Sequence, residues 1–107
     1  MTGDDMYPKA SKLFSNRLAY WTGQGLYGAD VYKRLAEDDE LPISFEPADA
    51  AEIMGVIPST LKKHRNRCSG PDFIRTSGRT VRYPRAAFCY WLARRYVKVG
   101  QRQREPA

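Results

Sequence analysis

The residues best suited to chemistry in this chain are cationic, and they gather in two short stretches between residues 58 and 82. Lysine and arginine donate hydrogen bonds to phosphate oxygens and guanine edges, asparagine pairs with adenine, and serine or threonine commonly holds a phosphate. These residue types predict contacts with double-stranded DNA. The candidate contact residues are Pro58, Ser59, Thr60, Lys62, Lys63, Arg65, Asn66, Arg67, Arg75, Arg79 and Arg82.

The net charge of +6 is spread unevenly along the chain. Residues 1–45 carry a net charge of −2, whereas residues 46–107 carry +8. From Lys62 onward the only acidic residues are Asp72 and Glu105. A basic half on a small protein favours a nucleic-acid partner, although a solvated basic surface without any partner would have the same composition.

Two short helices joined by a tight turn would position the first basic stretch. Prolines favour helix starts at residues 47 and 58, and Gly55 tolerates the positive φ that ends the first of these helices. The second helix would extend to about Arg67 and present its polar side chains outward. The residues expected to lock the two helices together are Ala51, Gly55, Val56 and Leu61.

A β-hairpin would position the second basic stretch. Strand-like runs at 73–75 and 81–83 flank a five-residue loop that contains Gly78 and Arg79. Arg79 is best placed to reach a minor groove or its phosphates. For Arg75 and Arg82, on the strands, the alternative is that they interact across the strands with solvent or with Glu52.

A last helix, opened by Pro84 and extending to about Val97, is apolar on two sides. One apolar stripe consists of Phe88, Trp91, Leu92 and Tyr96. So small a domain cannot cover a helix on both sides, so we expect the N-terminal residues or a second copy to cover the other stripe. This packing or oligomerisation surface consists of Ala86, Tyr90, Ala93 and Val97.

The expected organisation is an N-terminal extension over 1–45, a DNA-binding domain over 46–97 and a basic tail over 98–107. Within the extension, residues 13–21 favour a weak helix and residues 29–37 a short one, separated by a Gly-rich loop. We expect the tail to be disordered and to contribute non-specific phosphate contacts. The predicted fold is therefore mainly α with a small β-hairpin.

Several motifs occur in the order found in one family of small DNA-binding proteins. The chain resembles the MerR-type winged helix-turn-helix domains of phage excisionases and AlpA-like regulators, over about half its length. In that family an A-A-x-x-x-G-V turn motif precedes G-P-x-[FY]-I, a G-R-x-x-x-Y wing and a helix ending in W-L. The matches are Ala50-Ala51 with Gly55-Val56, Gly70-Pro71 with Phe73-Ile74, Gly78-Arg79 through Tyr83, and Trp91-Leu92.

The resemblance implies an excisionase, also called a recombination directionality factor. Such a protein binds and bends attachment-site DNA, self-associates along it and directs a tyrosine-type or other integrase toward excision. The alternative on the same fold is a small transcriptional regulator of a mobile element or prophage. A third interpretation is a protein-interaction adaptor whose basic face is incidental.

Two residues depart from the family's pattern. Ile57 stands where the family has serine or threonine as the N-cap of the second helix, a change that costs about 1 kcal/mol of local stability. His64 stands where an apolar residue commonly anchors that helix. The tilt and length of the helix are therefore less well defined than its existence.

Nothing in the sequence favours an enzyme, a cofactor or a small-molecule substrate. His64, Cys68 and Cys89 lack the usual spacing of zinc ligands, so we expect free thiols, a half-buried or phosphate-binding His64 and no metal. No run of about 18 apolar residues is present, so we expect no membrane contact. The first residues lack a signal-peptide pattern, and we expect a cytoplasmic, nucleoid-associated bacterial protein.

Overall fold

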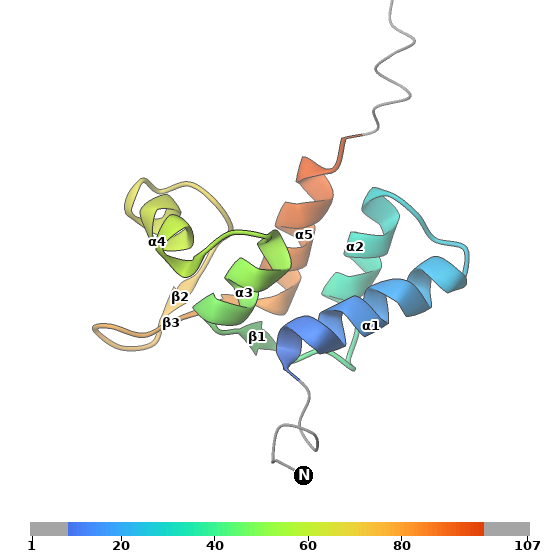
Figure 1. The fold of residues 1–107 in the computed structure, drawn as a ribbon, viewed down its shortest axis with the longest axis horizontal. Helices are drawn as coiled ribbons and strands as arrows, with labels where there is room; N and C mark the ends of the chain where they lie inside the picture. Colours follow the sequence, from blue (N-terminus) through green and yellow to red (C-terminus); the bar gives the residue numbers. More distant parts are fainter. Residues whose placement is uncertain (1–8, 98–107) are drawn as a thin grey trace, which may run out of the picture.

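The computed structural model describes residues 9–97 of the 107-residue chain. The predicted basic tail over 98–107 therefore lies outside the described residues. The described part is mainly helical and includes a small antiparallel sheet (Figure 1). Its elements, in chain order, are α1 (Ala10–Gly23), α2 (Ala29–Ala36), β1 (Ser44–Phe45), α3 (Pro47–Met54), α4 (Pro58–Asn66), β2 (Ile74–Arg75), β3 (Val81–Pro84) and α5 (Arg85–Arg95).

Prolines begin both α3 and α4, and a glycine ends α3, as predicted. Pro47 and Pro58 each occupy the first turn of their helix, where the missing N–H group costs no hydrogen bond. Gly55 ends α3 in the left-handed conformation, with φ at 78°. The N–H group of Val56 then donates to the carbonyl of Ala51 at 2.9 Å, so only a short turn separates the two helices.

The sheet has three strands, with β3 in the middle. The predicted hairpin is confirmed, since β2 pairs with β3 across a loop that begins with a 2.8 Å bond between the Thr76 N–H and the Thr80 carbonyl. The third strand, β1, was not predicted. It pairs with β3 so that Phe45 lies opposite Tyr83, and it falls at the predicted boundary between the N-terminal extension and the domain.

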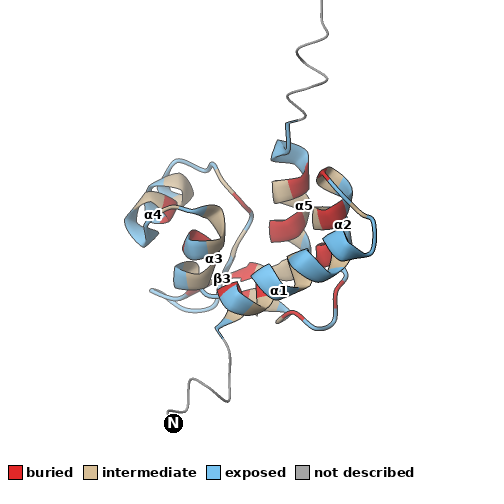
Figure 2. Cartoon of the chain, turned by 45° about the vertical axis from the view of Figure 1, so that its right-hand side comes forward, coloured by how far each residue is buried: buried red, intermediate tan, exposed pale blue. Residues whose placement is uncertain are grey.

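One hydrophobic core joins the N-terminal helices to the sheet and α5 (Figure 2). Phe45, Tyr83 and Phe88 are fully buried at its centre. The ring of Phe45 lies 5.4 Å from that of Phe88 and 6.2 Å from that of Phe14 on α1. Burial of large aromatic side chains dominates core energetics, so residues on both sides of position 45 stabilise the same core.

The N-terminal residues cover part of the second apolar stripe of α5. Helix α2 packs along α5 (Figure 1), and Ala93 is buried. Tyr90 is half-buried, and its hydroxyl donates to the Glu37 carboxylate at 3.0 Å. Ala86, in the first turn of α5, remains exposed, and so does Val97, which lies beyond the end of α5 at Arg95 rather than inside the helix as predicted.

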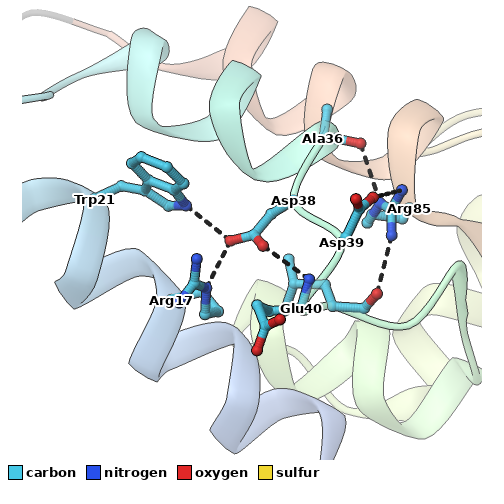
Figure 3. Close-up of polar contacts among 8 residues, drawn as sticks. Arg17, Trp21, Ala36, Asp38, Asp39, Glu40 and Arg85 are labelled. Atoms are coloured by element: carbon cyan, nitrogen blue, oxygen red, sulfur yellow. Dashed lines mark hydrogen bonds and ion pairs between the residues drawn. The ribbon is translucent and has the colours of Figure 1, made fainter.

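A buried carboxylate fixes the turn that follows α2 (Figure 3). Asp38 accepts hydrogen bonds at 2.7 Å from Arg17 Nε and from Trp21 Nε1, and at 2.9 Å from the backbone N–H of Glu40. Burial alone would raise the pKa of this carboxyl, but these hydrogen bonds and the Arg17 charge outweigh it and lower the pKa. Asp38 thereby ties α1 to the turn.

Arg85, at the start of α5, holds the same turn from the other side (Figure 3). Its guanidinium donates to the carbonyls of Ala36 and Leu41 at 3.1 and 2.9 Å. Together Asp38 and Arg85 connect α1, α2 and α5. Among the described residues, no helix is long and apolar enough to cross a membrane.

Candidate nucleic-acid interface

A cleft of about 410 Å³ separates α4 from the hairpin formed by β2 and β3. Five of the eleven predicted DNA-contact residues line it, and the lining contains no acidic side chain. A concave surface with converging guanidinium, ammonium and amide donors suits a polyanionic backbone. The lining residues are Lys62, Arg65, Asn66, Arg75, Gly78, Arg79 and Val81.

The register of the hairpin decides which arginines reach the cleft. Arg75 pairs with Val81 and Ile74 pairs with Arg82. Because neighbouring residues on a strand point to opposite faces, Arg75 shares a face with the buried Val81. Arg82 lies on the other face together with Ile74, so the structure does not bring it into the cleft with the other predicted residues.

Arg82 instead joins β3 to the segment around β1. Its guanidinium donates to the Ser44 hydroxyl at 3.1 Å, to the Ser44 carbonyl at 3.3 Å and to the Glu46 carboxylate at 3.2 Å. The acidic partner is therefore Glu46 and not the expected Glu52, which accepts a hydrogen bond from Ser11. Since both Arg82 and Glu46 are substantially exposed, this ion pair contributes at most about 1 kcal/mol.

Arg65 connects α4 to the sheet. Its Nη1 donates to the hydroxyl of the fully buried Tyr83 at 2.9 Å, and its guanidinium carbon lies 6.0 Å from the centre of the Phe73 ring. A guanidinium has five N–H donors, so this bond leaves others available at the cleft. Arg65 thus both positions α4 and lines the cleft.

Most of α4 is open to solvent (Figure 2). Leu61 is its buried residue and anchors the helix in the core. The first turn of α4 contains no acidic residue, whereas its last turn is basic. Thr60 is half-buried, and the exposed members of the predicted contact set on and just after α4 are Pro58, Ser59, Lys62, Lys63, Asn66 and Arg67.

His64 packs against the turn that follows α4. It is half-buried, and its Nδ1 lies 3.2 Å from the Ser69 hydroxyl oxygen. Gly70 faces it with φ at 83°, and a Cβ at Gly70 would lie only 3.1 Å from the His64 Cβ. This contact positions the turn between α4 and the hairpin.

The two cysteines lie in different surroundings. Cys89 is fully buried, and burial raises the pKa of its thiol to about 12, so it is protonated at neutral pH. Cys68 is exposed. Within residues 9–97, no group of three or more His, Cys, Asp or Glu side chains is arranged to hold a metal ion.

Comparison with known proteins gives no family assignment. No protein-family model, no curated protein and no solved structure matches this chain. The geometry of the cleft and the residues around it are therefore the basis of the functional proposal.

Proposed function

We propose that this protein is a winged helix-turn-helix protein that binds double-stranded DNA. In this proposal α4 is the recognition helix that enters the major groove, and the β2–β3 hairpin is a wing that contacts the adjacent groove. The observation that carries the proposal is the cleft between α4 and the hairpin, where Lys62, Asn66, Arg75 and Arg79 converge and whose lining contains no acidic side chain.

The dimensions and surface of α4 support this docking. The major groove is about 12 Å wide and admits one α-helix, and α4 presents exposed polar side chains from Ser59 to Asn66. Lys62 and Lys63 would donate to guanine edges or phosphates, and Asn66 would pair with adenine. The exposed Arg79, in the loop of the hairpin, would reach phosphates or a minor groove beyond the helix.

The biological role within this proposal is that of an excisionase. Copies bound side by side would bend attachment-site DNA so that an integrase favours excision, and the protein itself would catalyse nothing. The motif resemblance supports this role, and Ala86 and Val97 leave part of the predicted self-association surface exposed. The alternative is a transcriptional regulator of a mobile element, which would use the same DNA-binding surface. Either role places the protein in the cytoplasm, on the nucleoid.

A pair of charge-removing variants tests the docking. Arg79→Ala removes one positive charge from the cleft, whereas Lys33→Ala removes one from the exposed side of α2, away from α4 and the hairpin (Figure 1). If Arg79 contacts phosphate, its loss weakens binding to all duplexes about equally and lowers the salt dependence by about one counterion. Fluorescence anisotropy with labelled duplexes measures both quantities.

The Lys33→Ala variant provides the matched control, since it carries the same net charge as Arg79→Ala. We expect it to bind duplex DNA nearly as the unmodified protein does. Equal losses in the two variants would mean that net charge alone drives binding, and the proposed orientation of α4 and the hairpin would be wrong.

A further inference from the structure

Ile57 is poorly suited to its position on two separate grounds. It is the N-cap of α4 and forms no side-chain capping hydrogen bond, whereas the hydroxyl of a serine or threonine there would accept one from the first turn and stabilise the helix. It is also 64% exposed and belongs neither to the core cluster nor to the apolar residues packed against it. Within the described residues, no packing contact accounts for an isoleucine there.

The location of Ile57 distinguishes it from other exposed isoleucines. Single exposed apolar residues are ordinary on protein surfaces, and Ile43 and Ile74 are also exposed, at 81% and 55%. Ile43 precedes β1, and Ile74 lies on the face of the hairpin that points away from the cleft. Only Ile57, of these three, stands at the start of α4, directly before the exposed Pro58 and Ser59.

In the proposed docking, this end of α4 is the end nearest the bases. The N-terminal residues of a recognition helix contact base edges in the major groove. An aliphatic side chain can neither donate nor accept a hydrogen bond, so the chemical feature it recognises there is the 5-methyl group of thymine. Resting on the proposed DNA-binding function, we infer that Ile57 determines specificity by packing against a thymine methyl group.

The backbone at Ile57 allows this residue to be replaced without disturbing the helix. Its φ and ψ of −82° and 153° lie in the ordinary extended region. Its carbonyl accepts from the N–H groups of Thr60 and Leu61, which any residue at this position would also provide. The Ile57→Ser variant therefore removes the aliphatic side chain, supplies a favourable N-cap and is expected to raise rather than lower the thermal stability of the protein.

The test begins with selection of a preferred site from a library of random duplexes by the full-length protein. Each thymine of the selected site is then replaced in turn by deoxyuridine, which removes only the 5-methyl group. At one thymine we expect the affinity of the unmodified protein to fall about fourfold, the loss corresponding to one buried methyl group. Ile57→Ser is expected to bind the thymine and deoxyuridine forms of that site equally well.

Two control variants sharpen the test. Ile57→Val keeps an aliphatic side chain and should retain discrimination between thymine and deoxyuridine. Ile43→Ser makes the isoleucine-to-serine change at the exposed residue that precedes β1, and this variant should also retain the discrimination. A selected site without thymine would overturn the inference. So would discrimination that is absent from the unmodified protein or persists in Ile57→Ser. All three results leave duplex binding itself in place, whereas failure to select any duplex would refute the proposed function as well.

Discussion

Arginine side chains serve three different purposes around the cleft. Arg65 bonds to the hydroxyl of Tyr83 and fixes α4 on the sheet, and Arg82 bonds to Ser44 and connects β3 with β1. Arg79 is exposed in the hairpin loop, where it is available to a ligand. Loss of Arg65 or Arg82 would therefore disturb the protein itself, and only the Arg79→Ala variant reports directly on binding.

The buried carboxylate of Asp38 makes stability depend on pH. Because its folded pKa is below the unfolded value of about 3.9, its stabilising contribution is present above that value and is lost as the pH falls through the folded pKa. Asp38→Asn should lower the free energy of unfolding at pH 7, and its difference from the unmodified protein should shrink below about pH 4. Urea unfolding between pH 7 and pH 2 measures this.

The neighbouring Asp39 provides the control for that experiment. Its side chain is 99% exposed, and it lies 3.9 Å from the Arg85 guanidinium. Asp39→Asn should therefore leave both the stability at pH 7 and its pH dependence nearly unchanged. An equal effect of the two substitutions would show that the hydrogen bonds to Asp38 do not stabilise the fold.

Among the elements, those marked by local signals were predictable from sequence. Prolines mark the starts of α3 and α4, Gly55 marks the end of α3, and a glycine-containing loop between two apolar runs marks the hairpin. The strand β1 was not predictable, because it has two residues and exists through its pairing with β3, about 40 positions away. The end of α1 at Gly23 also exceeds the predicted end at residue 21, since helix ends depend weakly on sequence.

The candidate site was predictable in its residue types but not in its internal contacts. Polar residues on α4 were expected to face outward, and most of them are exposed. The bonds from Arg65 to Tyr83 and from Arg82 to Ser44 span 18 and 38 positions, and they depend on which face of the sheet each side chain occupies. The predicted five-residue loop places Arg75 opposite Val81, and therefore on the other face of the hairpin from Arg82. The loop length was thus the sequence signal that could have shown that the two arginines point in opposite directions.

The turn between α4 and the hairpin requires a glycine at position 70. Its φ of 83° is unfavourable for other residues by about 1–2 kcal/mol, and an added Cβ would press against His64. Gly70→Ala should therefore lower the free energy of unfolding by at least that amount and weaken DNA binding by shifting the hairpin relative to α4. Chemical denaturation and anisotropy on the same duplex measure the two effects.

Gly78, in the hairpin loop, is the matched control for this turn. No atom lies within 4 Å of a Cβ added there, and its φ is outside the left-handed region. Gly78→Ala should change stability by less than about 1 kcal/mol. A Gly70→Ala variant as stable as Gly78→Ala would contradict the structure of this turn.

In the whole molecule, the two halves of the sequence share one core but differ in charge. Residues 9–45, in which five basic and five acidic side chains balance, contribute α1 and α2, which lie on the opposite side of the molecule from α4 and the hairpin (Figure 1). The half with a net charge of +8 contributes the cleft. An asymmetric charge distribution of this kind orients a protein toward a polyanion before contact, so the N-terminal helices both complete the core and leave the basic face open.

The most direct test of the central claim is the salt dependence of duplex binding by the full-length protein. If α4 and the hairpin together make about six phosphate contacts, affinity should fall roughly a thousandfold between 50 and 200 mM salt. Anisotropy titrations of a labelled duplex over that range measure the slope. A steep, linear loss on a logarithmic scale is the predicted result, whereas salt-insensitive binding, or no duplex binding at 50 mM salt, would contradict the account and favour a protein-interaction adaptor.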